Sequence, residues 1–337
     1  MPRLPLNPQL AKPPSERIDI VYLWVDGADP AWQARRRQAL LRPAAQGALA
    51  AHGDVQGRYR DNGELRFNLR ALHRFFPDHG HIFLVTDGQT PAWLRPSPGL
   101  TIIDHRDLLP AAALPVFDSG HIESYLHHIP GLAERFIYLN DDVFFGAPVD
   151  PAFWFSSAGV AVFMESATVP DYAGFQAHES ALVNASLLSR QWLSGRDSAY
   201  RHAPHIFAHS PRPMLKSAMR QLEQEAATLF SQVRSTVFRL WDSPPLVSDL
   251  MPRWLLHTGR AVVHQADSMY FGSGDSDAAQ QFAQLTARFG SLPFFCINDT
   301  SDDAASDAPE LRQIECTLAA LLPAPSPFEH LDAARLL

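Results

Sequence analysis

The chain has 337 residues, of which 46% are hydrophobic, and its formal charge is −8 at neutral pH. This length allows a sizeable buried core, in one large domain with insertions or in two domains. The negative charge argues against non-specific binding to nucleic acid or to an anionic membrane, although it leaves room for a local basic pocket. The two cysteines, Cys296 and Cys316, lie far apart and form no CxxC pattern, which disfavours a disulfide framework or a thiolate zinc site.

No apolar run approaches the roughly 20 residues that are needed to cross a bilayer. The Pro-rich segment 1–14 also lacks the apolar centre of a signal peptide. We therefore expect a cytoplasmic protein, with peripheral association at the inner membrane left open. Residues 1–16 are expected to form a flexible arm.

A strand is predicted over residues 18–26, where β-branched and aromatic residues precede an Asp-Gly turn, and a helix is predicted over residues 32–41. A first strand that ends in this way suits the entrance to a nucleotide site. Trp24 could stack on a base, and Gly27 could allow backbone N–H groups to approach a phosphate. The alternative for Trp24 is an ordinary place in the core.

The most explicit helix pattern covers residues 58–76 and follows a predicted loop at 42–57. Asp61 and Glu64 have the spacing of a capping box. The apolar residues of one face recur at helical spacing and predict burial there: Leu65, Leu69, Leu72 and Phe76.

The charged residues of this segment divide into two groups. Arg70 and Arg74 are expected on a solvated face of the helix. The site candidates gather at its N-terminus, where free N–H groups favour anions. They are Arg60, Asp61, Asn62 and Arg66.

Further strands are predicted at 81–87 and 100–105, and this alternation of strands and helices is typical of α/β proteins. Ser119 is expected to cap the next helix. Its inward residues would be Ile122, Leu126 and Ile129. Glu123 and His127 are four residues apart and could meet, which is more common as a surface contact than as a site. His121 lies on another face.

The apolar run at 136–146 is interrupted by Asn140, Asp141 and Asp142. It predicts a buried strand whose carboxyl end opens into a site, because ligands bind beyond such strand ends in open α/β sheets. Adjacent carboxylates repel each other, so a pair held between hydrophobic residues favours a hard divalent cation. The alternative is a simple turn, since Asn and Asp favour turns.

His209 is the candidate general base in the second half of the chain. Pro213 is expected in the first turn of a helix that continues to about residue 233, so His209 would precede a helix N-terminus. That environment favours the neutral imidazole, which can accept a proton. Strands are predicted at 159–165 and 261–265, and the region from 166 to 205 is read as irregular.

The segment 292–299 repeats the pattern of an apolar strand that ends in Asn-Asp, here Asn298 and Asp299. Two such ends favour a shared metal or phosphate site. An acidic loop follows, with Asp302, Asp303 and Asp307. Asp307 and Glu310 are expected to cap a last helix.

Several segments together resemble the conserved blocks of the Stealth family. The most specific are Val21-Tyr-Leu-Trp-Val-Asp-Gly27, Arg60-Asp-Asn-Gly-Glu-Leu-Arg66, Val85-Thr-Asp-Gly-Gln89 and Tyr138-Leu-Asn-Asp-Asp-Val143. The region 205–256 is similar more loosely: His209 and Arg239 look like the family's catalytic His and Arg, but Arg212 stands where a second His often occurs. The Ser-Gly-His of 119–121 and His128 also depart from the family pattern.

The resemblance implies an α/β fold with a GT-A/Rossmann-like mixed sheet, flanked by helices and carrying a helical insertion in the second half. We expect a nucleotide-sugar-binding part at 17–165, a largely helical acceptor and catalytic part at 166–260, and a C-terminal part at 261–337 that completes the core and the active site. The implied partners are a nucleotide-sugar donor and a glycan acceptor.

The implied reaction transfers a sugar 1-phosphate from a UDP-sugar to an acceptor hydroxyl and releases UMP, with GlcNAc-1-phosphate as one candidate group. Phosphoryl transfer depends mainly on positioning and charge stabilisation. The resemblance assigns catalysis to Asp142, His209 as base and Arg239. It assigns Mg²⁺ or Mn²⁺ to Asp141, Asp142 and Asp299. It assigns substrate binding to Trp24, Val25, Asp26, Gly27, Arg60, Asp61, Asn62, Arg66, His121, Asn140 and Asn298.

Two alternatives remain at this stage. A metal-dependent glycosyltransferase would use the residues 140–142 to bind the donor diphosphate and would release UDP. A non-catalytic protein would bind a sugar nucleotide or a glycan without turnover. The nucleotide product separates these possibilities.

Overall fold

The computed structural model describes residues 17–42, 49–51, 53–265, 267–299, 301, 304 and 308–330. The predicted flexible arm at 1–16 lies outside the described residues. So do Asp302, Asp303 and Asp307 of the predicted acidic loop.

A five-stranded sheet with the order β3-β2-β1-β4-β9 forms the centre of the molecule. Its strands are β1 (Ile18–Leu23), β2 (Ile82–Thr86), β3 (Leu100–Asp104), β4 (Arg135–Asn140) and β9 (Arg212–Leu215). The first four are parallel, in the order of a Rossmann-like half-sheet, and β9 is antiparallel to β4. Because Leu23 of β1 lies opposite Asn140 of β4, the carboxyl ends of these strands open at the same place.

Two smaller sheets complete the β-structure. One has the order β10-β7-β6, with β8 also paired to β7, and the other has the order β11-β12-β5. Their strands are β5 (Val143–Phe145), β6 (Phe155–Ser156), β7 (Gly159–Thr168), β8 (His205–Phe207), β10 (Ala261–His264), β11 (Met269–Gly272) and β12 (Phe294–Asn298). In the second of these sheets Cys296 lies opposite Val143, so the two Asn-Asp strand ends predicted from the sequence approach each other.

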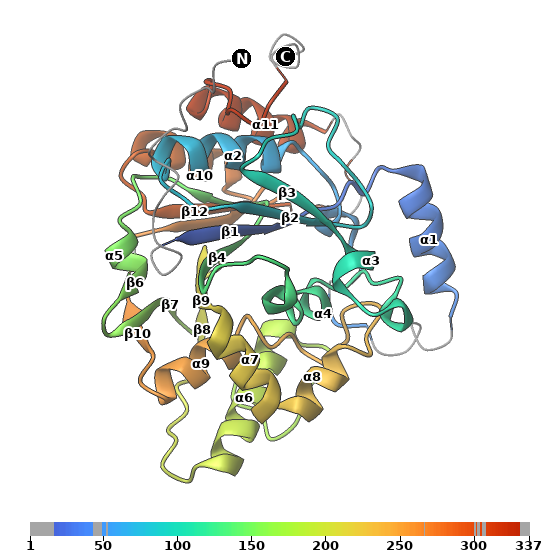
Figure 1. Cartoon of the computed structure of the whole chain (residues 1–337), viewed down its shortest axis with the longest axis vertical. Coiled ribbons are helices and arrows are strands. Elements are labelled where there is room, and N and C mark those ends of the chain that lie inside the picture. The colour runs from blue at the N-terminus through green and yellow to red at the C-terminus, as the bar shows by residue number, and fades with distance from the viewer. Residues whose placement is uncertain are drawn as a thin grey trace, which may run out of the picture.

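Helices cover both sides of the central sheet. Those above it in Figure 1 are α2 (Glu64–Phe75), α10 (Ala278–Arg288) and α11 (Pro309–Leu321). Those below it are α4 (Ser119–Glu123), α6 (Ala181–Arg196), α7 (Lys216–Glu225), α8 (Ala227–Val233) and α9 (Leu250–His257). The remaining helices are α1 (Pro30–Leu40), α3 (His105–Leu108) and α5 (Pro151–Trp154), and short 3₁₀ turns lie at Gln56–Arg58, Ala111–Ala113 and Leu126–His128.

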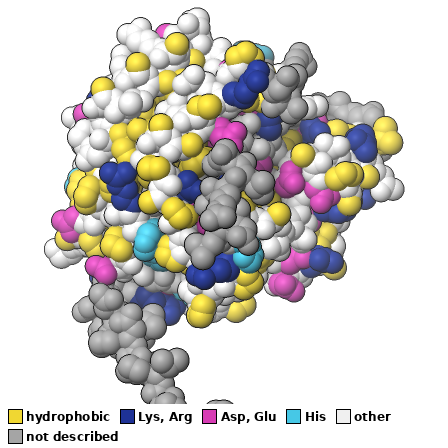
Figure 2. Space-filling model, turned by 90° about the horizontal axis from the view of Figure 1, so that it is seen from above, with side chains coloured by type: hydrophobic (Ala, Val, Ile, Leu, Met, Phe, Trp, Pro, Cys, Tyr) yellow, Lys and Arg dark blue, Asp and Glu magenta, His cyan; other side chains and the backbone are white. Residues whose placement is uncertain are grey.

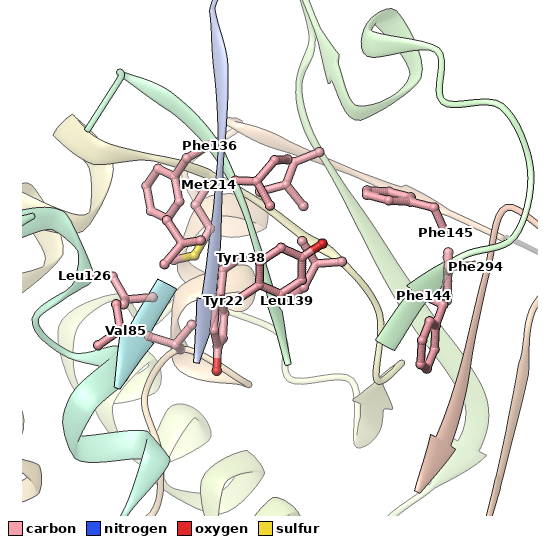
Figure 3. Close-up of a cluster of buried hydrophobic side chains, with 14 of the residues drawn as sticks. Tyr22, Val85, Leu126, Phe136, Tyr138, Leu139, Phe144, Phe145, Met214 and Phe294 are labelled. Carbon is pink, nitrogen blue, oxygen red and sulfur yellow. The ribbon is translucent and has the colours of Figure 1, made fainter. Parts of the chain in front are cut away.

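The core is built from the central sheet and from the β5–β12 pair. Tyr22, Tyr138 and Leu139 pack with Val85, Leu126 and Met214 around β1 and β4, as Figure 3 shows. The rings of Phe144 and Phe295 stack with their centroids 4.9 Å apart. Residues 141–142 are thus held between two buried apolar strands. The predicted mixed α/β fold with helices in the second half is confirmed.

The start of α2 differs from the prediction. The helix begins at Glu64, and its N-cap is Gly63, with φ of 82° and no side-chain cap. The Glu64 carboxylate accepts from the backbone N–H of Asn62, while Asp61 accepts from the N–H of Gly63. The capping-box prediction was therefore wrong, because these carboxylates stabilise the turn before the helix instead of its first free N–H groups.

The prediction for Pro213 was also wrong. Residues Arg212–Leu215 form strand β9, and α7 begins only at Lys216. Proline is tolerated because β9 is the last strand of the sheet, where one row of backbone groups needs no partner strand. His209 consequently lies in the loop between β8 and β9 and does not precede a helix N-terminus.

Two other segments were predicted incorrectly. The region read as irregular contains the 16-residue helix α6, whose Ser180 side chain accepts from Val183 N–H. The helix expected from Ser119 is short: α4 ends at Glu123, its cap is Asp118, and a separate 3₁₀ turn follows. Ile122, Leu126 and Ile129, which were expected to point inward, are buried.

Helices α6 to α9 fall within the predicted acceptor part, and β10 to β12 within the predicted C-terminal part. The three-part division itself stays a prediction. Within the described part of the chain, no helix combines the length and apolarity required to cross a membrane. On the face seen in Figure 2, basic, acidic and hydrophobic side chains are interspersed.

Candidate active site

A cavity of about 730 Å³ opens at the carboxyl ends of β1 and β4. It is large enough for a ligand of the size of a sugar nucleotide. The predicted site residues that line it are Trp24, Val25, Arg60, Asn140, Asp141, Asp142, His209, Arg239, Asn298 and Asp299. These residues come from segments up to 275 residues apart, between Trp24 and Asp299, so the fold brings most of the predicted site together.

Asp142 forms the centre of the most compact group of side chains in the cavity. Its Oδ1 lies 3.3 Å from Nε2 of His209, and its Oδ2 accepts from Sγ of Cys296 at 3.4 Å. Burial alone would raise the pKa of Asp142, but the charge of His209 and the hydrogen bonds from His209 and Cys296 outweigh it and lower this pKa. Asp142 therefore remains ionised next to the imidazole.

For two other carboxylates of the cavity, Asp141 and Glu64, no such interactions outweigh the effect of burial on the pKa. Burial raises the pKa of Asp141 well above the usual carboxyl range, and the charges of Asp142, Glu64 and Asp61 raise it further. Burial, with a contribution from Asp61, also raises the pKa of Glu64 to about 8. Asp141 thus lies at a point of crowded negative charge, and none of the side chains that shift its pKa is cationic.

A divalent cation would relieve this repulsion. Carboxylate oxygens are the ligands that Mg²⁺ and Mn²⁺ prefer, so Asp141 and Asp142 fit the predicted metal. Asp299 fits it less well: its carboxylate pairs with Arg60 at 2.5 Å and also accepts from Ser301 and Asn62. Asp141 and Asp142 therefore stay the predicted metal ligands, whereas Asp299 has Arg60 as its partner.

Three further basic side chains line the cavity: Arg58, Arg212 and Arg239. Burial lowers the pKa of Arg58, and the nearby charge of Arg239 lowers it further. Arg239 donates to the hydroxyl of Ser119 at 2.7 Å and lies 3.6 Å from Asp118. Several arginines that line one cavity favour an anionic ligand with several oxygens.

Two arginines that were predicted to bind substrate, Arg60 and Arg66, are paired with carboxylates. Arg66 pairs with Glu329 at 2.6 Å and does not line the cavity. Arg60 lines the cavity, but its guanidinium bonds Asp299, Ser301 and the carbonyl of Ala304. The predicted N-terminal anion site of α2 is thus not assembled as expected, and Asp61 and Asn62 serve mainly to shape the turn before the helix.

Arg70 corrects a further expectation. It is buried instead of solvated, and it binds Glu329 through two nitrogen atoms at 2.8 and 2.7 Å. Arg74 is exposed as expected and donates to the carbonyl of Leu321. The partner residues come from the C-terminal segment, so α2 uses its arginines to hold that segment.

Only part of the segment that was predicted to bind the nucleotide, residues 24–27, lines the cavity. Trp24 is buried and also lines the cavity, so a place in the core is compatible with a position beside a ligand. The N–H of Gly27 donates to the carbonyl of Tyr59 at 2.8 Å, so it is not free for a phosphate. A Cβ at Gly27 would lie 2.1 Å from that carbonyl oxygen, and this close approach explains the glycine. Asp26 closes the turn by accepting from Ala28 N–H.

His121 does not line the cavity. It is buried, and its Nδ1 bonds the carbonyl of Thr236 at 2.7 Å. Its predicted role in substrate binding has no geometric support here, since a structural bond accounts for its position.

Sequence reasoning missed several cavity residues, namely Glu64, Arg58, Arg212, Glu123 and Tyr270 as wall residues and Cys296 beneath Asp142. Glu123 is buried and accepts from the hydroxyl of Tyr138 at 2.8 Å, whereas His127 bonds Glu223. Glu123 and His127, which could have met on one helix face, therefore have separate partners. Strand alternation in 269–272 and 294–298 could have indicated Tyr270 and Cys296, but only their pairing with neighbouring strands shows which face they occupy.

Comparison with known proteins identifies two regions of this chain. Residues 16–42 match Stealth protein CR1, conserved region 1, and residues 58–163 match Stealth protein CR2, conserved region 2. The second match contains Arg60, Asp141 and Asp142.

Curated relatives match over nearly the whole chain. An exopolysaccharide phosphotransferase of Nocardia farcinica is 35% identical over 94% of this chain and 62% of its own length. Exopolysaccharide phosphotransferase SCO6023 of Streptomyces coelicolor is 37% identical over 94% of this chain and 53% of its own length. CpsY of Mycobacterium tuberculosis, also an exopolysaccharide phosphotransferase, is 32% identical over 94% of this chain and 58% of its own length. The chain thus spans between about half and two thirds of the length of these relatives.

Among solved structures, a complex of the galactosyltransferase LgtC with donor and acceptor sugar analogues aligns over 92% of this chain and 98% of its own. The sequence identity is 12% and the TM-score is 0.45, and no conclusion is based on so distant a match. The chain carries conserved regions 1 and 2 of the Stealth proteins, at residues 16–42 and 58–163.

Proposed function

We propose that the cavity is the active site of a sugar-phosphate transferase, which moves a hexose 1-phosphate from a UDP-sugar to a hydroxyl of a glycan and releases UMP. The observation that carries the proposal is the presence, in one cavity, of the Asp142–His209 pair and of three arginines, Arg58, Arg212 and Arg239. Relatives named exopolysaccharide phosphotransferases support the same reaction class.

The proposed reaction is a displacement at the phosphorus that carries the sugar. The acceptor oxygen forms a bond to this phosphorus, and the bond to the bridging oxygen breaks, so the electron pair leaves with UMP. The product is a phosphodiester between the sugar and the glycan. The anomeric C–O bond of the donor sugar stays intact.

His209 is the proposed base. With its Nε2–H donating to Asp142, the lone pair lies on Nδ1, which can take the proton of the acceptor hydroxyl. Asp142 fixes this tautomer and stabilises the imidazolium that forms. The pair therefore does not need the helix N-terminus that was expected before His209.

The three cavity arginines are proposed to bind the non-bridging oxygens of the diphosphate, where negative charge develops on the leaving UMP. We assign this role to Arg58, Arg212 and Arg239, because Arg66 does not line the cavity and Arg60 pairs with Asp299 at 2.5 Å, more tightly than Arg239 with Asp118 at 3.6 Å. Asp141 and Asp142 would hold Mg²⁺ or Mn²⁺, which neutralises diphosphate charge when bound. Trp24 and Val25 would face the nucleotide, and Asn140 and Asn298 would orient the substrates.

A panel of UDP-sugars, incubated with Mg²⁺ and a polysaccharide acceptor, tests the proposal. We expect acceptor-dependent release of UMP with at least one donor, and its loss in Asp142→Asn. Acceptor-dependent release of UDP would instead support glycosyl transfer. Donor binding without any nucleotide release would support a non-catalytic protein.

A further inference from the structure

The group around Asp142 contains a thiol and an imidazole in addition to its carboxylate. One ligand atom from each of Asp142, His209 and Cys296 lies within 4.8 Å of the other two. Mg²⁺ prefers oxygen ligands only, whereas sulfur, imidazole nitrogen and carboxylate oxygen together suit Zn²⁺ and related ions. The chemistry of this group therefore differs from that of the Asp141–Asp142 carboxylate pair.

We propose that Asp142, His209 and Cys296 form a binding site for a thiophilic divalent cation such as Zn²⁺, distinct in its ligands from the proposed Mg²⁺ site and sharing only Asp142 with it. Zn–N and Zn–O bonds of about 2.0–2.1 Å and Zn–S bonds of about 2.3 Å place tetrahedral ligand atoms roughly 3.3–3.8 Å apart. The separations of His209 Nε2 from Oδ1 of Asp142, 3.3 Å, and of Cys296 Sγ from its Oδ2, 3.4 Å, fall in this range, and one atom of each residue lies within 4.8 Å of the other two.

The surroundings leave one side of the site open. Cys296 is fully buried behind Asp142, while the His209 and Asp142 side chains are 29% and 19% exposed towards the cavity. A cation can therefore approach from the cavity and find the thiol at the back, with the fourth position left for water or a substrate oxygen. Binding converts the Cys296 thiol to a thiolate and releases its proton to the solvent.

Occupancy of this site would inhibit the enzyme, and this consequence rests on the proposed function. The cation takes the lone pair of His209 Nε2, so the ring proton moves to Nδ1. The nitrogen that would accept the acceptor proton then carries a hydrogen. The same cation also binds Asp142. His209 can then no longer act as the base, and Asp142 can no longer orient it.

The second His and carboxylate group in the described part of the chain provides a comparison. It consists of His127, His128 and Glu223, and it contains no sulfur. Arg234 already pairs with Glu223, which disfavours an additional cation there. Cobalt bound to a thiolate gives a near-ultraviolet charge-transfer absorption that cobalt on His and Glu does not give, so this band distinguishes the two groups.

The test is a titration of the whole chain with Co²⁺, followed by competition with Zn²⁺. We expect a thiolate band that saturates at one ion per chain, that Zn²⁺ abolishes and that excess Mg²⁺ does not. Cys296→Ser should lose the band, whereas Cys316→Ser, which changes the exposed cysteine, and His128→Ala should keep it. No band in the unsubstituted protein, or a band that persists in Cys296→Ser, would overturn the proposal.

His209→Ala covers the case in which Cys296→Ser does not fold. Because His209 is partly exposed, this variant should fold, and its affinity for Co²⁺ should fall at least about tenfold. Unchanged affinity would equally overturn the proposal. Inhibition of transfer by Zn²⁺ is measured separately, relative to each variant's own activity, so that failure of the proposed reaction is not mistaken for failure of metal binding.

Discussion

Asp142 has two functions in the proposed site, because it orients His209 and contributes a carboxylate to the proposed metal. Asp142→Asn keeps the size of the side chain but removes its charge. We predict that it loses nearly all transfer activity while the melting temperature stays close to that of the original protein. Activity should also disappear in excess EDTA and return with Mg²⁺ or Mn²⁺. Full activity in EDTA would exclude the metal role.

His209→Ala tests the proposed base. General-base catalysis contributes on the order of 10²–10⁴ in rate, so turnover should fall by about this factor. Donor affinity and melting temperature should change little, because the ring contacts Asp142 and lies edge-on to Tyr270 at the cavity surface. His178→Ala, at an exposed histidine, is the matched control. If the His209 variant is folded, binds donor and turns over normally, His209 is not the base.

Glu329 gives a prediction for the dependence of stability on pH. Burial alone would raise its pKa, but the hydrogen bonds from Arg70 and Arg66 outweigh burial and lower this pKa from 4.5 to about 2. The native state therefore binds fewer protons than the unfolded state between these values. The stabilisation is complete above about pH 4.5 and is lost as the pH falls towards about 2.

Glu329→Gln should remove this acid dependence and lower the free energy of unfolding at neutral pH by about 3–5 kcal/mol, since Arg70 would stay buried beside a neutral partner. Denaturant unfolding at several pH values measures both effects. Glu315→Gln, at an exposed position of α11, should change neither. Equal acid sensitivity of Glu329→Gln and the original protein would contradict this account.

At the scale of elements, the pairing of β5 with β12 positions the proposed site. The backbone N–H of Ile297 donates to the carbonyl of Asp142, and Phe295 stacks on Phe144 directly beside it. Phe295→Ala should lower the free energy of unfolding by about 3–5 kcal/mol, and it should reduce transfer even where the protein remains folded. Leu41→Ala, at a side chain that is 75% exposed, should stay within about 0.5 kcal/mol.

Elements with strong local patterns could be predicted from the sequence. The runs that became β1, β4 and β12 are apolar enough to identify buried strands, and α2 shows a clear apolar face. Local patterns failed where the neighbouring element decides. Pro213 suits a helix start in isolation, but it lies in an edge strand, and α6 mixes Ala and Ser with its apolar residues and so shows little periodicity.

In the candidate site, too, local patterns could be predicted from the sequence and contacts between distant segments could not. Asn140, Asp141 and Asp142 were predicted because a strand end directs them towards the same opening. The partners of Arg66 and Arg60 could not be predicted, because Glu329 and Asp299 lie 263 and 239 residues further along the chain. An arginine that is paired in this way has the same local sequence as one that is free for a phosphate.

At the scale of the whole molecule, the cavity joins segments from both halves of the chain. The conserved regions at 16–42 and 58–163 supply Trp24, Val25, Asp141 and Asp142, whereas His209, Arg239 and Cys296 come from later segments. This arrangement supports a single site in which donor phosphates and the acceptor hydroxyl meet, and it makes the fate of the donor phosphorus the decisive question.

The most direct measurement follows that phosphorus. A UDP-sugar that is radiolabelled in the phosphate next to the sugar is incubated with the protein, Mg²⁺ and a polysaccharide acceptor, and the glycan and nucleotide products are separated. Our account predicts that the label moves into the glycan, in an amount equal to the unlabelled UMP released. Label that remains in released UDP, with unlabelled sugar in the glycan, would contradict it.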